Sequence, residues 1–251
     1  EYDALYDELG MLEKETGYIL SNSPTVNVGY EVLSELPKER HESPMLSLDK
    51  TKSPEALAEW LGSQKGLLSW KLDGLTIVLT YDNGQLQKAV TRGNGEVGEI
   101  ITNNARVFKN VPVTIPFKGK LVLRGEAIIT YSDFERINEQ IPEADAKYKN
   151  PRNLVSGSVR QLDNRIAAQR HIKFVAWKVP TVIYSNSFLN RLKYAEKLGF
   201  EIVPLYTYSG KSSDKENLPE MIESLKTKAH NYGYPIDGLV MTYNDIQYGE
   251  S

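Results

Sequence analysis

The segment from residue 75 to residue 91 most constrains the fold, because it has the pattern of a β-hairpin. Alternating apolar residues flank Asn83-Gly84 on both sides, in Leu-Thr-Ile-Val-Leu-Thr-Tyr-Asp before it and Gln-Leu-Gln-Lys-Ala-Val-Thr after it. Both turn residues tolerate a positive φ, so a two-residue type I′ turn is expected. The pattern therefore predicts two adjacent antiparallel strands.

Further elements are predicted on both sides of this hairpin. The first 17 residues have helical spacing that ends at Gly17, residues 18–43 are predicted to be a loop, and Ser53-Pro54 begins a capped helix. More strands are predicted at 121–130, 174–184 and 239–243, and more helices near 132–140, 187–199 and 217–230. Because the strands do not alternate strictly with helices, we predict an α+β fold with mostly antiparallel sheets.

Composition excludes several classes of protein. The chain has 251 residues and no cysteine, which rules out a disulfide framework, a thiol nucleophile and a cysteine zinc site. Three scattered histidines have no metal-ligand spacing, so no protein metal site is predicted. No run of about 18 apolar residues exists, and the start of the chain does not resemble a signal peptide. We therefore expect a cytoplasmic protein without a membrane span.

Charge is unevenly distributed along the chain. The formal net charge is -3, which alone argues against binding to nucleic acid. Residues 147–173, however, contain seven basic residues and one acid, Asp163. The basic residues are Lys147, Lys149, Arg152, Arg160, Arg165, Arg170 and Lys173. This stretch is consistent with a phosphate-binding patch and equally with a solvated surface helix.

Lys71 is the first candidate for chemistry. It lies in Trp70-Lys71-Leu72-Asp73-Gly74, just before the hairpin, where a charge is unexpected. Alone, this K-x-D-G pattern also fits a solvent-facing strand residue followed by a bulge at Gly74. Six further motifs accompany it: Pro44-Met45-Leu46-Ser47-Leu48-Asp49, Thr91-Arg92-Gly93-Asn94-Gly95, Arg124-Gly125-Glu126, Asn150-Pro151-Arg152-Asn153, Gly157-Ser158-Val159-Arg160-Gln161-Leu162-Asp163 and Ile236-Asp237-Gly238-Leu239-Val240.

Together these motifs resemble those of the bacterial NAD-dependent DNA ligases, in particular their adenylation (nucleotidyltransferase) domain. The resemblance runs from Glu1 to Ser251. It implies a nucleotidyltransferase fold (ATP-grasp-like ligase fold) with mostly antiparallel sheets, preceded by a partial small helical domain. We expect residues 1–40 to be a remnant of the N-terminal helical domain that binds nicotinamide mononucleotide (NMN), plus a linker. Residues 41–251 would then be the adenylation domain, truncated before the last lysine motif and the OB-fold.

The resemblance implies that Lys71 and Asp73 are catalytic. In the family, the lysine of K-x-D-G attacks the adenylyl phosphorus of NAD, releases NMN and holds AMP as a phosphoramidate. An amine is a good nucleophile for phosphorus, and the P–N bond is labile enough to pass AMP onward. AMP then moves to a DNA 5′-phosphate, and the 3′-hydroxyl displaces it. The expected partners are therefore NAD, transient Mg²⁺ and nicked double-stranded DNA, bound by a monomer with a nucleoid-associated function.

The resemblance also implies a set of NAD-binding residues. They are Tyr2, Asp3, Ser47, Leu48, Ser69, Lys71, Arg92, Glu126 and Trp177. Tyr2 and Asp3 match the clamp on the NMN half of NAD. Arg92 matches an arginine that contacts the nucleotide, and Glu126 an acid that holds the ribose, roles that suit a planar guanidinium and a hydrogen-bond-accepting carboxylate. Trp177 matches the aromatic residue that stacks on adenine. The alternative for Arg92 and Glu126 is an ordinary cross-strand ion pair.

Three positions differ from the usual family pattern. Ser69 replaces a glutamate that helps to recognise adenine, Asn94 replaces an aspartate, and Thr242 replaces a lysine that meets the phosphate. Loss of that lysine removes a charge-assisted contact worth about 2 kcal/mol in a dry site. The chain is then either a divergent domain that adenylates with compensating cations such as Lys178, or a degenerate domain that binds nucleotide without efficient chemistry. We favour the first, because the other motif residues remain.

A third interpretation is a relative that shares only K-x-D-G, such as an ATP-dependent ligase or an RNA-capping guanylyltransferase. The stretch from Pro44 to Asp49 and the Tyr2-Asp3 pair argue against it.

Overall fold

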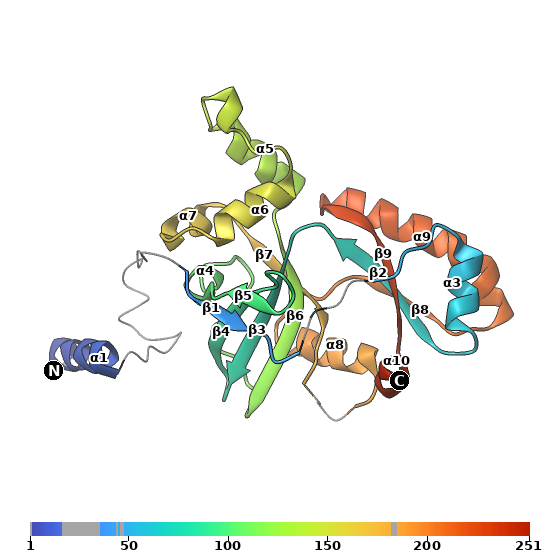
Figure 1. The fold of residues 1–251 in the computed structure, drawn as a ribbon, viewed down its shortest axis with the longest axis horizontal. Helices are drawn as coiled ribbons and strands as arrows, with labels where there is room; N and C mark the ends of the chain where they lie inside the picture. The colour runs from blue at the N-terminus through green and yellow to red at the C-terminus, as the bar shows by residue number, and fades with distance from the viewer. Residues whose placement is uncertain (1, 17–35, 44, 46–47, 182–184) are drawn as a thin grey trace.

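The computed structural model describes residues 2–16, 36–43, 45, 48–181 and 185–251 (Figure 1). Helix α1 (Tyr2–Thr16) confirms the helix predicted at the start of the chain. Most of the loop predicted at 18–43 lies outside the described residues. Its described end contains strand β1 (Lys38–Arg40), so the prediction of a loop is wrong there. β1 pairs antiparallel with β5 (Val97–Glu99), and three residues are too few for alternation to show in a sequence.

The predicted hairpin forms two strands of a four-stranded antiparallel sheet with the order β4-β3-β6-β7. β3 (Leu75–Asp82) and β4 (Gln85–Thr91) are joined by Asn83 at φ 46° and Gly84 at φ 83°, which confirms the predicted turn. β6 (Lys120–Ile128) pairs with β3, and β7 (Lys173–Lys178) pairs with β6.

Helices cover one face of this sheet and enclose the larger hydrophobic core. They are α4 (Thr102–Ala105), α6 (Pro151–Val159), α7 (Asn164–Gln169) and α8 (Phe188–Lys197). Ile77 and Leu123 of the sheet belong to this core together with Leu154 of α6 and Leu192 of α8. Helix α5 (Tyr131–Glu139) and the 3₁₀ turn η1 (Ala144–Ala146) connect β6 to α6. Because side chains alternate along a strand, the residues between these core positions face the other way.

A three-stranded antiparallel sheet with the order β8-β2-β9 forms the second part of the body. Its strands are β2 (Gly66–Leu72), β8 (Leu205–Tyr208) and β9 (Ile236–Tyr243). Helices α3 (Pro54–Leu61) and α9 (Ser212–Tyr232) contribute to a second core with Leu68, Trp70 and Leu72 of β2. Ser53 caps α3 and Pro54 begins it, as predicted. Short helix α10 (Ile246–Glu250) follows β9.

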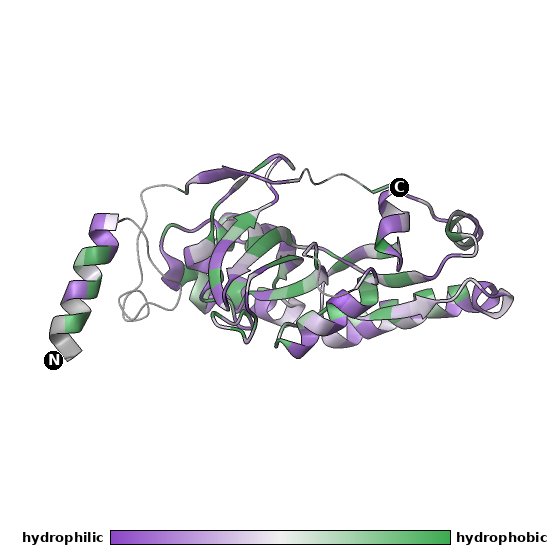
Figure 2. Ribbon diagram, turned by 90° about the horizontal axis from the view of Figure 1, so that it is seen from below, coloured by the Kyte–Doolittle hydropathy of each residue, from purple (hydrophilic) through white to green (hydrophobic). Residues whose placement is uncertain are grey.

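The two sheets meet where β6 and β7 reach the second core. Ile128 of β6 and Val175 of β7 belong to that core, although their strands are part of the four-stranded sheet. Figure 2 shows hydrophobic residues concentrated on the central strands, with hydrophobic and hydrophilic residues alternating along α1. This junction between the sheets is where the candidate site lies.

The architecture confirms the α+β prediction, since every ladder between named strands of the described residues is antiparallel. β7 is shorter than the strand predicted at 174–184, because Pro180 has no N–H with which to continue a ladder. None of the described helices is long and apolar enough to cross a bilayer.

Candidate active site

Lys71 lies near the end of β2 and is held there by its neighbour. Trp70 is 2% exposed, and its indole N–H donates to the Leu225 carbonyl of α9 at 2.8 Å. Alternation then turns Lys71 to the opposite face, where 42% of its side chain is exposed. Its Nζ donates to both carboxylate oxygens of Asp237 at 2.8 Å, with Asp237 supplied by β9. Lys71 is therefore an oriented, solvent-reachable amine.

Asp73 and Gly74 carry the chain from the three-stranded sheet into the four-stranded sheet. The Asp73 N–H donates to the Pro235 carbonyl at 2.9 Å, which ties this turn to the start of β9. A Cβ on Gly74 would lie 2.0 Å from the Ala127 carbonyl oxygen, closer than any real contact. Glycine is therefore required where this turn passes close to β6, which accounts for its place in K-x-D-G.

Glu126 lies on β6, on the sheet face that turns away from the larger core. It is 8% exposed and accepts a hydrogen bond from the Thr76 hydroxyl at 3.1 Å. Burial raises the pKa of Glu126 to about 7, while hydrogen bonds from Thr76 and Trp177 and the charges of Lys71 and Arg152 act in the opposite direction. Two of the predicted site residues, Lys71 and Trp177, are therefore close enough to Glu126 to affect its pKa, as is Arg152.

Asp237 and Arg152 complete this cluster, and neither was among the predicted site residues. Arg152, near the start of α6, lies 3.6 Å from the Asp73 carboxylate and lowers the pKa of Glu126. Both residues lie in motifs that the sequence displays, but their roles depend on strand and helix packing that no local pattern reveals. We call Lys71, Asp73, Glu126, Arg152 and Asp237 the junction cluster.

Arg92 lies at the edge of the junction cluster. Its N–H donates to the Thr76 carbonyl at 2.9 Å, and its guanidinium donates to the Met45 carbonyl at 3.3 Å. The alternative of a direct ion pair between Arg92 and Glu126 is wrong, since no such contact is formed and Thr76 stands between them. The Pro44–Asp49 motif therefore approaches the site at least at Met45.

Asn94 explains one departure from the family pattern. Its side-chain oxygen accepts hydrogen bonds from the N–H groups of Glu96 at 3.0 Å and Val97 at 2.8 Å. Gly93 in the same turn has φ 58°, and a Cβ there would lie 2.0 Å from the Val97 carbonyl oxygen. An amide oxygen serves this turn as well as a carboxylate oxygen does, so asparagine can replace aspartate.

Ser69 and Thr242, the other two departures, are neighbours on the face that carries Lys71. In the β2–β9 register Ser69 opposes Val240 and Leu67 opposes Thr242. Ser69 and Thr242 are therefore diagonal cross-strand neighbours, about 7 Å apart and within reach of long side chains. A glutamate and a lysine at these two positions would lie close enough to interact. Their joint replacement by neutral residues leaves no unbalanced charge.

Lys178 was expected to compensate for the lysine missing at Thr242, which would place its charge near Lys71. The charges that act on it are those of Arg124, Glu250 and Arg191, and Lys71 is not among them. Trp177, one residue earlier, instead donates a hydrogen bond to the Glu126 carboxyl group.

The remaining predicted site residues are less defined. Tyr2 and Asp3 begin α1, which Figure 1 places apart from β2 and β6; their side chains are outside the described part, as is Ser47. Leu48 is described and is 57% exposed. The described residues contain no group of three or more His, Asp or Glu that could hold a metal ion.

Comparison with known proteins gives one family. The family model described as NAD-dependent DNA ligase adenylation domain matches residues 33–251. A protein named DNA ligase from Lachnoclostridium phytofermentans is 59% identical over 254 residues, which cover 100% of this chain and 38% of that protein. A DNA ligase from Ruminiclostridium cellulolyticum is 58% identical, with the same coverage of 100% and 38%.

The chain thus spans 38% of the length of these curated relatives. Among solved structures, an archaeal ATP-dependent RNA ligase aligns with 14% identity and a TM-score of 0.48, over 81% of this chain and 46% of that chain.

Proposed function

Because the chain belongs to the family of NAD-dependent DNA ligase adenylation domains, we propose that it transfers AMP from NAD to Lys71. The observation that carries the proposal is the junction cluster. In it the accessible amine of Lys71 contacts one carboxylate, and a second cation–carboxylate pair lies nearby. These are Lys71–Asp237 at 2.8 Å and Arg152–Asp73 at 3.6 Å. A lysine nucleophile needs such an oriented setting, with further positive charge nearby for the phosphates of its substrate.

In the proposed step the free amine of Lys71 donates its lone pair to the adenylyl phosphorus. The P–O bond to NMN breaks, NMN leaves with the bridging oxygen and its electron pair, and the nitrogen loses a proton. Asp237 already accepts hydrogen bonds from Nζ, so it is placed to receive that proton. The product is a lysyl-AMP phosphoramidate, and Arg152 offsets the charge of its phosphate.

The other predicted residues take the rest of NAD in this proposal. The Glu126 carboxyl group accepts hydrogen bonds from the ribose, and the Trp177 ring contacts the adenine. Arg92 approaches the nucleotide from the turn beside Met45. Ser69 lies on the Lys71 face at the adenine end. By the family resemblance, Ser47 and Leu48 also contact NAD. Tyr2 and Asp3 would close over the NMN half.

Mg²⁺ fits the donor set as a transient ion. It usually binds through one or two carboxylates together with substrate phosphates and water, and Asp73 and Asp237 are the carboxylates available. When bound, it would neutralise the charge that develops as NMN leaves.

The further steps belong to the longer proteins that this chain resembles. We propose nicked double-stranded DNA as the acceptor of AMP, a monomeric state, and a cytoplasmic setting on the nucleoid. We also propose a domain boundary near residue 40, with residues 1–40 serving the NMN half and residues 41–251 the adenylation reaction. The start of the family match at residue 33 supports a boundary in this region.

Mass spectrometry of the intact protein tests the reaction. After incubation with NAD and Mg²⁺ we expect a mass increase of one AMP, which is absent in Lys71→Ala and retained in Lys65→Ala, a control lysine just before β2. Label that persists in Lys71→Ala would exclude this nucleophile. Label from ATP but not from NAD would exclude the proposed donor.

The same assay separates the proposal from a degenerate domain. The observation that favours degeneracy is the neutral pair Ser69 and Thr242 on the Lys71 face. Calorimetric binding of NAD to the wild-type protein with no covalent AMP would support that alternative.

A further inference from the structure

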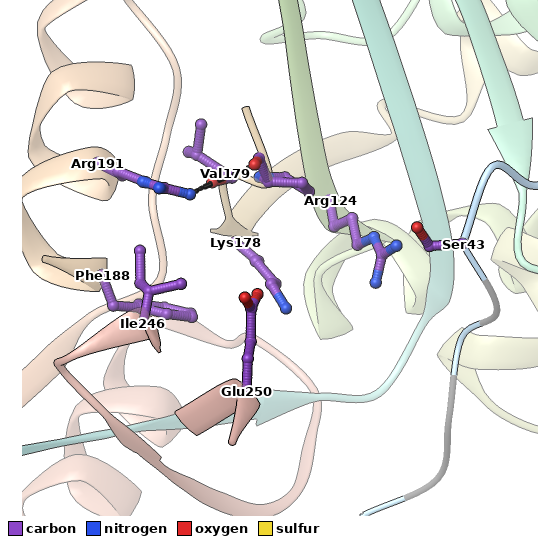
Figure 3. Close-up of a pocket in the computed structure, with 9 residues that line it drawn as sticks. Ser43, Arg124, Lys178, Val179, Phe188, Arg191, Ile246 and Glu250 are labelled. Carbon is purple, nitrogen blue, oxygen red and sulfur yellow. Dashed lines mark hydrogen bonds between the residues drawn. The ribbon is translucent and has the colours of Figure 1, made fainter. Parts of the chain in front are cut away.

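A cavity of about 310 Å³ opens between β6, β7, α8 and α10, outside the junction cluster (Figure 3). Arg124 of β6 and Lys178 of β7 form one wall, and Phe188 of α8 and Ile246 of α10 form an apolar wall. Arg124 lies two residues before Glu126 on the same strand face, so the cavity begins about 7 Å along β6 from that carboxyl group. We call it the cationic pocket.

The two cations of the wall stand directly opposite each other. Arg124 and Lys178 are cross-strand partners in the β6–β7 ladder. Like charges at directly opposite positions destabilise a sheet. Burial lowers the pKa of Arg124, and burial followed by the charge of Arg124 lowers the pKa of Lys178. Among the described residues, no carboxylate lies within 4 Å of either cation.

A third cation and one carboxylate complete the charge of the pocket. Arg191 is 7% exposed, and its guanidinium donates to the backbone carbonyls of Ser185, Val179 and Pro180 at 2.9 to 3.3 Å. These carbonyls satisfy its hydrogen bonds without cancelling its charge. With Glu250 on α10 as the lining carboxylate, three cations and one anion leave a net charge of +2.

The Arg124 guanidinium retains a free donor. Its Nε is buried and has no hydrogen-bond partner among the described residues. Figure 3 shows Arg124 and Lys178 entering the same cavity, with Glu250 approaching Lys178 from α10. A buried donor without a partner, beside uncompensated positive charge, is the environment that a bound oxyanion would stabilise.

We propose that the cationic pocket binds the phosphate group of a nucleotide-sized phosphate monoester, at a site separate from Lys71. Arg124 and Lys178 bind the dianion, and the apolar wall of Phe188 and Ile246 contacts the rest of the ligand. The cavity is larger than a phosphate ion, which leaves room for this second part. The phosphate has two sources, a free mononucleotide or the 5′-phosphorylated end of a DNA strand.

Isothermal titration of the full chain with inorganic phosphate tests the site first. We expect Lys178→Met to weaken binding about tenfold or more, since it removes a charge-assisted contact. Glu250→Gln, at an exposed position, should tighten binding because it removes the opposing negative charge. Lys193→Met, on the exposed side of α8, is the matched control and should leave phosphate affinity unchanged.

The unfolding free energy gives a second readout. Without phosphate, Lys178→Met should be at least as stable as the wild type, since one of two facing cations is gone, and phosphate should no longer stabilise it. Equal phosphate affinity in wild type, Lys178→Met and Glu250→Gln would overturn the proposal. An equal loss in Lys193→Met would overturn it as well, because that result indicates general charge screening.

The ligand source is resolved by comparing wild type with Lys178→Met in two further titrations. Tighter binding of AMP than of phosphate, lost in the variant, identifies a mononucleotide site. Tighter binding of a 5′-phosphorylated oligonucleotide than of its 5′-hydroxyl counterpart, lost in the variant, identifies a DNA end.

Discussion

Replacing Glu126 by glutamine should change how stability depends on pH. Burial raises the pKa of this carboxyl group from 4.5 to about 7 in the folded protein. Between these values the unfolded chain has released the proton and the folded chain retains it, so the unfolded state binds fewer protons and stability falls as pH rises. The loss is about 1.4 kcal/mol per pH unit, totals about 3 kcal/mol, and levels off above pH 7. Glutamine is similar in size and cannot ionise.

Urea unfolding at pH 5.5, 6.5, 7.2 and 8 measures this effect in the wild type and in Glu126→Gln. Other titrating groups are common to both proteins, so their difference isolates Glu126. We expect the stability of the variant relative to wild type to increase by about 2 kcal/mol between pH 5.5 and pH 8. Glu220→Gln, an exposed glutamate on α9, should show no such trend. A difference between wild type and Glu126→Gln that stays constant over this range would refute the raised pKa.

Three further predictions test the local geometry. Asn94→Asp should leave the free energy of unfolding nearly unchanged, because the side-chain oxygen is kept, whereas Asn94→Ala should cost about 1 kcal/mol in urea unfolding. Gly74→Ala should cost about 3 kcal/mol or more by the same measurement, because its Cβ would lie 2.0 Å from the Ala127 carbonyl oxygen; a loss below 1 kcal/mol would contradict this contact. Ser69→Glu and Thr242→Lys should each lower the rate of AMP labelling, and the double variant should recover it. Additive effects in this cycle would show that the two positions are not coupled.

The sequence could predict those parts of the fold that local signals specify. Asn83-Gly84 fixes the β3–β4 turn through positive φ angles, and Ser53-Pro54 fixes the start of α3, so both predictions are confirmed. The position of β2 between β8 and β9 depends on contacts across long stretches of chain. Lys71 and Asp237, for example, are 166 residues apart. Periodicity within a short window carries no information about such partners.

The same distinction applies to the candidate site. Motifs selected Lys71, Asp73 and Glu126 as candidates, because each motif lies within a single segment. Arg152 and Asp237 were visible in the sequence but had no assigned role, since their contacts arise where α6 and β9 meet the ends of other strands. For Arg92, the alternative of an ion pair with Glu126 is replaced by a contact to the Met45 carbonyl and an intervening threonine.

The basic stretch at 147–173 shows why charge counted along a sequence differs from charge presented at a surface. Four of its seven basic residues are paired with acids in the described structure: Arg152 with Asp73, Arg160 with Glu99, Arg165 with Asp163 and Lys173 with Glu201. Three of these acids lie outside the stretch, so no count confined to it could include them. Arg170 lies over the Tyr148 ring, 5.6 Å from its centroid. Among the described residues, Lys147 and Lys149 are then the exposed basic residues of the stretch that form no such contact. Two lysines without an ion-pair partner attract a phosphate backbone less than seven unpaired basic residues would. If Arg152 or Arg160 were to bind a DNA phosphate, its ion pair would first have to open, so that a phosphate replaces the carboxylate.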